Sequence, residues 1–198
     1  MMIQMKILER IRGFSFNPSK EFAASKDDTL TEAFKYYVLL LAILALILAL
    51  AVSIVATAMA SMLALSELTL MPGLPELGKI APLLGAGAFV GIIAAGIIAA
   101  LYIAVWLHIW VYLFGGRKGL KQTTKAITYG ATPCLILGWV PGPNVIIAPI
   151  WSLLLVITGL MELHELSPGR SILAVILAIL LPLIIIGVIA AFIVPIIL

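Results

Sequence analysis

Four long stretches of this chain contain no Asp, Glu, Lys or Arg, and they limit its fold more than any other feature. They cover residues 36–66, 80–116, 126–161 and 171–198. A charge at the centre of a bilayer costs about 2.5–3.5 kcal/mol, and a helix needs about 20 mostly apolar residues to cross. Each stretch is long enough to span a membrane, and only 11% of the chain is charged while 64% is hydrophobic. The sequence therefore excludes a soluble globular protein and predicts a multi-pass membrane protein.

The apolar runs predict helices, because they are continuous and rich in Ala, Leu and Ile. The strands of outer-membrane barrels instead alternate over about 10 residues. The turn sequence Pro-Gly-Pro-Asn at 141–144 divides the third run, since a helix does not continue through it. We therefore expect an all-α membrane protein with five transmembrane helices, at about residues 36–66, 80–114, 125–140, 145–162 and 170–197.

The lengths of four predicted helices do not match the thickness of the hydrocarbon core of a bilayer. The two that flank the turn have roughly 16 residues, or about 24 Å each, against roughly 30 Å of hydrocarbon. We expect both to cross through a locally thinned bilayer, and a re-entrant hairpin is the alternative. The first two helices each have more than about 30 residues, so they must tilt or extend beyond the membrane.

Lysine and arginine predict how the chain is oriented. With five crossings, Lys79 falls on one side and the eleven other basic residues fall on the opposite side. Because basic residues concentrate in cytoplasmic loops, we expect a cytoplasmic N-terminus and a C-terminus on the opposite side. The eleven are Lys6, Arg10, Arg12, Lys20, Lys26, Lys35, Arg117, Lys118, Lys121, Lys125 and Arg170.

Residues 1–35 form a cytoplasmic segment in this prediction, ahead of a five-helix transmembrane domain at 36–198. Residues 1–14 are amphipathic, so they either lie in the headgroup layer or pack on the cytoplasmic ends of the helices. Asn17 and Pro18 predict the start of a short helix, and Thr29 with Glu32 has the spacing of a capping box. The single cysteine, Cys134, excludes an intramolecular disulfide and a cysteine-based metal site.

Few side chains in the predicted spans can carry chemistry. Within the four charge-free stretches, His108 is the only residue of the set Asp, Glu, Lys, Arg and His. It is either a hydrogen-bonded residue near the interface or part of a proton or ion relay. After the fourth helix come Glu162, His164, Glu165 and Arg170. The two carboxylates share a helical face that His164 does not, so we expect a solvated cytoplasmic loop in preference to a metal site.

Two further patterns suggest contacts rather than catalysis. Four basic residues follow the second predicted helix. They either set the orientation of the chain in the membrane or bind anionic lipid or phosphate; they are Arg117, Lys118, Lys121 and Lys125. Small residues on the second helix form a ridge for close helix packing, mostly within the chain, with a homodimer as the alternative; they are Gly87, Gly91, Ala95 and Ala99. We expect no catalytic site, cofactor or metal, because the usual motifs are missing, and no nucleic-acid binding.

Short elements along the whole chain carry a family resemblance. They are Asn17-Pro18, Phe22, Gly115-Gly116, Gly119, Tyr129, Pro133, Trp151, Gly159-Leu160 and His164-Glu165-Leu166-Ser167. Their order resembles the YIP family, membrane proteins named for interaction with Ypt/Rab GTPases. The resemblance implies five membrane helices with a cytoplasmic N-terminus, self-association and a role in membrane traffic. The chain lacks the long N-terminal region of the eukaryotic members, so it resembles a compact prokaryotic form, and we expect a prokaryotic cell membrane.

Two functional hypotheses follow. The first is a non-enzymatic integral membrane scaffold or adaptor that associates with itself, with membrane lipids, anionic ones included, or with a protein partner at its cytoplasmic face. The second is a small transporter or channel built on broken helices, since prolines interrupt the spans at Pro133, Pro149 and Pro182. Its candidate ligands are hydroxyls, and finding them in a dry, packed interior would count against transport; they are Ser53, Thr57, Thr132, Ser152 and Thr158.

Overall fold

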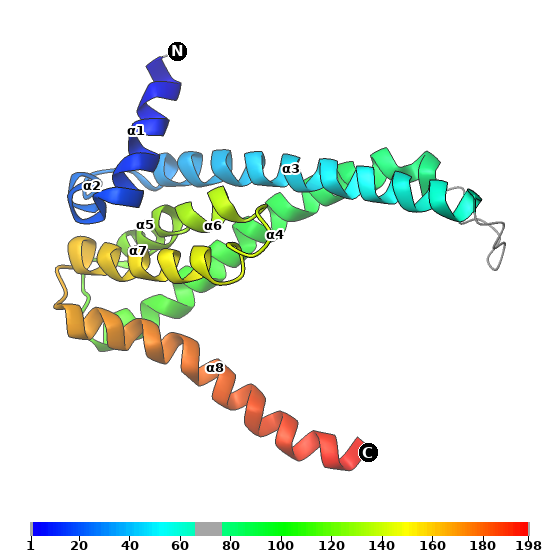
Figure 1. Cartoon of the computed structure of the whole chain (residues 1–198). Coiled ribbons are helices and arrows are strands. Elements are labelled where there is room, and N and C mark those ends of the chain that lie inside the picture. Colours follow the sequence, from blue (N-terminus) through cyan, green and yellow to red (C-terminus); the bar gives the residue numbers. More distant parts are fainter. Residues whose placement is uncertain (1, 66–76, 198) are drawn as a thin grey trace.

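The structure, a computed structural model, describes residues 2–65 and 77–197, and over these residues its regular elements are all helices (Figure 1). The side chains are described for residues 7–62 and 78–192. The predicted helix end at residue 66 and the side chain of Lys6 therefore lie outside the described parts. The helices are α1 (Met2–Phe16), α2 (Pro18–Ala24), α3 (Leu30–Leu65), α4 (Leu77–Leu113), α5 (Leu120–Gly130), α6 (Thr132–Leu137), α7 (Ile147–His164) and α8 (Pro168–Ile197).

Among the described residues, four helices are long and apolar enough to cross a membrane. The qualifying segments are Leu30–Met62, Gly78–Leu113, Ile147–His164 and Pro168–Phe192. The predicted all-helical fold is confirmed, but residues 125–140 do not form the single helix that we expected. They contain the end of α5, all of α6 and part of the turn that follows, because Pro133 has no N–H to continue the hydrogen-bond ladder of α5.

Local sequence rules account for the start of α3. The Thr29 N–H donates to Glu32 Oε2 at 2.7 Å, and the Glu32 N–H donates to Thr29 Oγ1 at 3.2 Å. This reciprocal pair is the predicted capping box, and it satisfies two N–H groups that a helix start leaves without partners. Pro18 begins α2 as predicted, although the Asn17 side chain makes no capping hydrogen bond.

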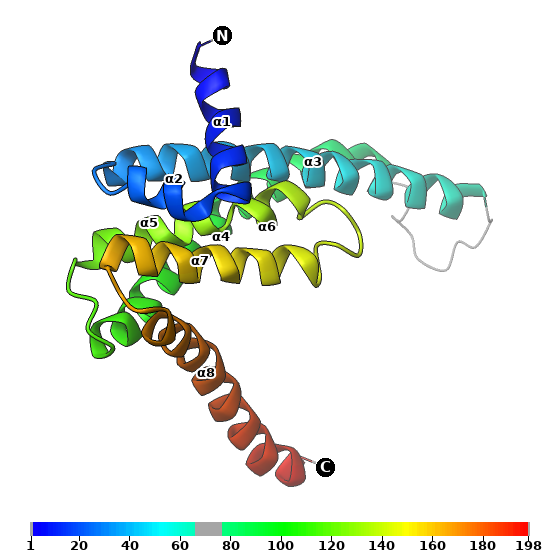
Figure 2. The ribbon, with the colours of Figure 1, turned by 60° about the vertical axis from the view of Figure 1, so that its left-hand side comes forward.

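Helices α3 and α4 form a long antiparallel pair, which both views show extending beyond the rest of the chain (Figures 1 and 2). The Tyr37 hydroxyl donates to the Gly96 carbonyl at 2.9 Å near one end of the pair. Towards the other end, Ser53 Oγ donates to the Ala81 carbonyl at 3.2 Å. A Cβ on Gly85 would lie 2.0 Å from Ser53 Oγ, so glycine there permits the close approach.

Helices α5, α6 and α7 form a hairpin that covers only one end of this pair, where α3 begins and α4 ends. The hairpin turns at Gly138, whose Cβ position is 3.1 Å from a methyl carbon of Leu44. From Leu44, α3 runs about 32 Å further to Leu65. Helix α8 packs beside the hairpin at its start and then diverges from the other helices in both views.

The molecule therefore has two unlike halves. The packed half contains α1, α2, α5, α6 and α7, together with residues 30–48 of α3, 96–113 of α4 and 168–179 of α8; it holds most of the buried core. The open half contains residues 49–65, 77–95 and 180–197, where most of the described large apolar side chains are exposed.

Candidate functional site

A buried polar cluster lies in the packed half, and Lys125 of α5 is at its centre. The Lys125 side chain is completely buried. Its ammonium donates to the backbone carbonyls of Ser25 and Lys26, both at 2.8 Å, and of Asp28 at 3.3 Å. These carbonyls belong to the end of α2 and the loop that follows, where acceptors otherwise have no helical partner. A cation there also stabilises the negative end of a helix dipole. Lys125 thus ties the N-terminal segment to α5.

A second set of charges joins α1 to the same place. The Arg10 guanidinium donates to Ser25 Oγ at 3.0 Å, lies 3.5 Å from a Glu21 carboxylate oxygen and forms a close ion pair with Asp28. The Tyr129 hydroxyl donates to the same Asp28 carboxylate at 2.5 Å. Burial alone would lower the pKa of Arg10, but hydrogen bonding and charge attraction from Asp28 leave it raised. Arg10 therefore stays charged, and Asp28 links α1 to α5.

Aromatic rings fill the space around these charges. The Phe14 ring stacks on Tyr129 with centroids 4.5 Å apart and meets the Phe22 ring edge-on at 4.9 Å. Tyr36 of α3 packs against Tyr129 at 5.4 Å, and its hydroxyl is 2.9 Å from Thr132 Oγ1. Phe14, Phe22, Tyr129 and Thr132 are completely buried. The end of α1 thus packs on the helices, which is one of the two predicted alternatives.

The earlier part of α1 is more open. Leu8 is 66% exposed, and Phe16 at the end of the helix is 72% exposed. Both views show α1 standing away from the body of the molecule at its N-terminal end (Figures 1 and 2). An exposed apolar side of this helix is therefore available for a contact outside the chain.

His108 lies in a short chain of hydrogen bonds. Its Nδ1 is 2.7 Å from Thr123 Oγ1, and the same hydroxyl is 2.9 Å from His164 Nε2. One hydroxyl bridges both rings, so it can donate to one imidazole and accept from the other. The described residues contain no group of three His, Cys, Asp or Glu side chains placed to bind a metal. The arrangement joins α4, α5 and α7 by polar contacts.

Glu165 connects three loops just after α7. Its backbone has the left-handed φ of 58°, a conformation that often caps the C-terminal end of a helix but that a non-glycine residue rarely adopts. Its carboxylate is 2.9 Å from Lys118 Nζ and 3.2 Å from Lys26 Nζ. The hydrogen bond and charge of Lys118, followed by those of Lys26, hold the pKa of Glu165 below its ordinary value.

The predicted loop group after α7 is therefore dispersed. His164 is buried and faces Thr123, whereas Glu165 is exposed and faces the two lysines. Arg170 is exposed at the start of α8, where its guanidinium is 3.5 Å from the Cβ position of Gly115. Glu162 is partly buried in the last turn of α7.

The four basic residues that follow the second predicted helix are dispersed as well. The Arg117 guanidinium lies 3.6 Å from the ring centre of Tyr112, Lys118 pairs with Glu165, and Lys121 is exposed. Including Lys125 in a lipid- or phosphate-binding surface was wrong, because its ammonium is buried and bonded to the carbonyls of the segment 25–28. Three of the four basic residues remain at the surface.

The small-residue ridge of α4 does not pack within the described chain. A Cβ on Gly87 or Gly91 would meet nothing within 4 Å, and Ala95 and Ala99 are exposed. The expectation that this ridge packs on a helix of the same chain was wrong, because α3 contacts a different face of α4. Gly85 and Gly96 make that contact.

Sequence reasoning missed the partners of Lys125. The sequence pattern indicates Arg10 only as one of the basic residues of the cytoplasmic side, and it singles out neither Asp28 nor Thr123. One signal was present, because a lysine at the edge of a long apolar run needs acceptors if it is to be buried. The acceptors are backbone carbonyls about 100 residues earlier, which no local pattern indicates.

Comparison with known proteins returns one family. The model of the Yip1 domain matches residues 12–191 of the chain. No curated protein and no solved structure matches it.

Proposed function

The chain belongs to the Yip1 domain family and is a multi-pass integral membrane protein, and from this premise we propose that it is a non-enzymatic membrane scaffold or adaptor. In this proposal the chain associates with protein partners, with lipids or with a second copy of itself. The contacts form at the packed half, on the cytoplasmic side, and involve the exposed side of α1 and the surface residues Arg117, Lys118 and Lys121.

One observation supports this proposal: residues 10–28 of the N-terminal segment are bonded to and packed on the membrane helices. Lys125 fixes the loop 25–28 by three hydrogen bonds, and Asp28 joins Arg10 to Tyr129. A cytoplasmic segment with no binding role does not require a buried lysine and a buried aromatic cluster to hold it. Fixing α1 and α2 in one orientation lowers the entropic cost of binding a partner there.

The proposed topology has α3, α4 and α8 crossing the membrane, with a cytoplasmic N-terminus as the basic residues predict. The hairpin of α5, α6 and α7 is re-entrant in this proposal. Its turn lies against Leu44, about 12 Å into the charge-free part of α3, which leaves about 32 Å of α3 beyond it. Exposed apolar side chains such as Val145 and Ile146 favour insertion of the tip into hydrocarbon.

The tip meets part of the hydrogen-bonding requirement of an apolar environment, although Asn144 Oδ1 is buried without a partner among the described residues. Asn144 Nδ2 donates to the Gly138 carbonyl at 3.2 Å, and the Asn144 N–H donates to the Val140 carbonyl at 3.2 Å. Pro141 and Pro143 have no N–H that would need a partner. Backbone groups inside a membrane must be satisfied within the protein, and much of this turn meets that condition.

Thiol labelling tests the topology. In a Cys134→Ala background, a Val145→Cys variant should resist a membrane-impermeant maleimide applied from either side, and a Lys121→Cys variant should react from the cytoplasmic side only. Labelling of position 145 from the far side would mean that the hairpin crosses the membrane.

The transport alternative has less support. All five hydroxyls named as candidate ligands are hydrogen-bonded to backbone groups. Ser53 donates to Ala81 and Thr57 to Ser53, Thr132 donates to Tyr129, Ser152 accepts from Cys134, and Thr158 donates to Leu154. Because these hydroxyls already bond within the protein, they give no support for the binding of a transported solute.

Reconstitution and cross-linking test the scaffold proposal together. The full chain in proteoliposomes should give no ion or solute flux above that of protein-free vesicles. In host membranes, a photo-reactive amino acid at Leu8 should cross-link to protein, either another copy or a partner. The same group at Ile98, exposed on α4, is the matched control and should react mainly with lipid. Flux that a His108→Ala change stops, together with lipid-only adducts at Leu8, would refute the proposal.

A further inference from the structure

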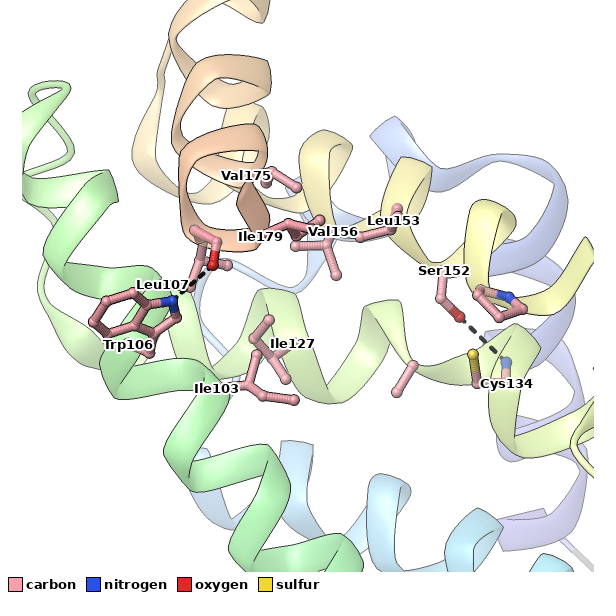
Figure 3. Close-up of a pocket in the computed structure, with 13 residues that line it drawn as sticks. Ile103, Trp106, Leu107, Ile127, Cys134, Ser152, Leu153, Val156, Val175 and Ile179 are labelled. Carbon is pink, nitrogen blue, oxygen red and sulfur yellow. Dashed lines mark hydrogen bonds between the residues drawn. The ribbon is translucent and has the colours of Figure 1, made fainter. Parts of the chain in front are cut away.

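An apolar pocket lies where α8 begins to diverge from the hairpin (Figure 3). It has a volume of about 440 Å³ and is enclosed by parts of α4, α5, α6, α7 and α8. Its floor is made of buried side chains that include Leu107, Ile127, Val156 and Val175, and its rim is made of the exposed side chains Ile103, Leu153 and Ile179. The pocket is thus open on the surface that faces lipid.

The side chains that line the pocket leave only the Ser152 hydroxyl proton and the Cys134 thiol as polar groups, in an otherwise apolar lining. The Trp106 indole N–H donates to the Ala178 carbonyl at 2.8 Å, so it is already used. Ser152 Oγ accepts from the Cys134 N–H at 3.2 Å, and both bonds can be followed in Figure 3. A bound molecule would therefore have to be hydrocarbon over the part that enters, because a polar group there would lose its hydrogen bonds to water.

The volume of the pocket indicates whether a hydrocarbon chain or a protein helix can enter it. A helix with its side chains is about 10–12 Å across, so a single 5.4 Å turn would fill roughly the whole pocket. A partner helix could therefore not enter beyond one turn, whereas an extended hydrocarbon chain fits lengthwise. At this depth in a membrane, the common molecule with such a chain is a phospholipid.

The positive charge of Arg170, in the first turn of α8, also favours a phospholipid. Arg170 shares a helical stripe with Ala174 and Ala178, and it lies two turns, or about 12 Å, from the pocket-lining Ala178. Arg170 is exposed and directly precedes the charge-free run 171–198, so it lies at headgroup level while the pocket lies within the hydrocarbon. A phosphate at Arg170 and an acyl chain in the pocket are therefore at the correct relative depths.

We infer that this pocket binds one acyl chain of a membrane phospholipid whose phosphate pairs with Arg170. The site goes beyond the scaffold proposal and does not depend on it, since it lies on the lipid-facing surface and away from α1. A chain held there fills the space between α8 and the hairpin and sets the angle at which α8 leaves the packed half.

Photo-labelling in vesicles tests the inference on the unmodified full chain. The protein is reconstituted in phosphatidylcholine vesicles that contain a small fraction of phosphatidylcholine with a diazirine in the middle of one acyl chain. After illumination, we expect adducts on the floor residues Val156 and Val175, which are buried and are contacted only by a chain that enters the pocket. Adducts confined to exposed residues such as Ile98 and Phe192 would overturn the inference.

Two variants of equal added volume sharpen the test. Ala131 lines the pocket, whereas Ala99 is exposed on α4 outside it. Ala131→Phe should lower labelling of the floor about tenfold, since displacing two methylene groups of a bound chain is enough for that factor. Ala99→Phe should leave it unchanged, and equal effects of the two variants would contradict the inference. Arg170→Gln should also lower labelling of the floor. Unchanged labelling would contradict the proposed contact between Arg170 and the lipid phosphate.

The lone cysteine gives a measurement that needs no substitution. Cys134 lines the pocket, so added phosphatidylcholine should protect it from N-ethylmaleimide in detergent-solubilised protein. An Ile98→Cys substitution in a Cys134→Ala background supplies the matched control, whose rate of alkylation should not fall. Protection of both positions to the same extent, or of neither, would overturn the inference even if Ala131→Phe fails to fold.

Discussion

The packed and open halves of this molecule are built from the same long helices, yet they are stabilised by different means. In the packed half, α1, α2, α3 and α5 meet around a buried lysine, an Arg10–Asp28 ion pair and a cluster of aromatic rings. In the open half, α3 and α4 contact each other while α8 diverges, and most of the described large apolar side chains are exposed. Polar side chains give the packed half its specific contacts, because each must find a partner when it is buried.

The difference follows from the solvent that each half requires. Exposed apolar side chains such as Ile54 and Leu183 are stable beside lipid, so they need no contact within the chain. Lys125 and Arg10 cannot be left unpaired away from water, so they fix the positions of the segments that pair with them. Substitutions should therefore matter far more in the packed half than in the open half.

Removal of the buried Lys125 ammonium should lower the stability of the packed half more than any other substitution proposed below. A Lys125→Met variant keeps most of the side-chain volume but removes the charged donor from three backbone carbonyls. The Ser25 carbonyl keeps the Asp28 N–H and the Lys26 carbonyl keeps Gln122 Nε2 as donors. The free energy of unfolding should fall by about 2–4 kcal/mol, because each hydrogen bond to a charged group contributes about 1.5–3 kcal/mol. Thermal unfolding in detergent or bicelles measures the change.

Lys121→Met is the matched control, one turn earlier in α5 and exposed. It removes the same charge and should change stability by less than about 0.5 kcal/mol. Equal losses in the two variants would mean that net charge, and not the bonds to residues 25–28, accounts for the effect.

Glycine-to-alanine substitutions compare the two halves directly. A Cβ on Gly159 of α7 would lie 2.9 Å from a Phe22 ring carbon and 3.0 Å from the Ala126 Cβ. Gly159→Ala should cost about 1–3 kcal/mol, because overpacking forces neighbouring groups to shift. Gly91→Ala meets nothing within 4 Å, so stability should stay the same or rise by up to about 1 kcal/mol.

The same thermal unfolding assay measures both glycine variants. A clear loss of stability in Gly91→Ala would indicate that this face of α4 is covered in the membrane by another helix, such as one from a second copy. No loss in Gly159→Ala would contradict the close packing of α2 on α7.

The smallest effect is expected at the exposed Glu165 junction and depends on pH. The folded chain lowers the pKa of Glu165 below its ordinary value of 4.5, so the carboxylate stabilises the folded state above that pH. The contribution should disappear as the pH falls from 4.5 through the lowered pKa. The melting temperature of wild type should therefore decrease more steeply over this acid range than that of Glu165→Gln.

Glu162→Gln provides the comparison for this effect, since Glu162 is in the preceding turn of α7 and is not part of the Lys26–Glu165–Lys118 contact. Its acid profile should follow that of wild type. Identical profiles for Glu165→Gln and wild type would show that the junction adds nothing measurable to stability.

Much of the secondary structure could be predicted from local patterns. The charge-free runs located the four long apolar helices, and the spacing of Thr29 and Glu32 located the start of α3. These features depend on residues that are close in sequence, so their physics can be evaluated without the fold. The break at Pro133 was visible as well, although its consequence for the 125–140 segment was underestimated.

Less of the candidate site could be predicted. Lys125 was assigned to a surface stripe because its spacing from Lys121 suits one, and the ridge of Gly87 and Gly91 was expected to pack within the chain. Both errors have the same origin, since periodicity identifies a face of a helix but does not identify what covers that face. The pocket between α8 and the hairpin has no sequence signal, because its walls come from five separate helices.

By itself, the sequence determined the membrane class, the positions of the long helices and the asymmetry of basic charge, because each depends on the cost of placing charge in hydrocarbon. Only the tertiary structure decided which half is packed, how far the hairpin reaches along α3 and which cations are buried. Those properties depend on which distant segments meet, and a buried group such as Lys125 is stable only where such a segment supplies its partners.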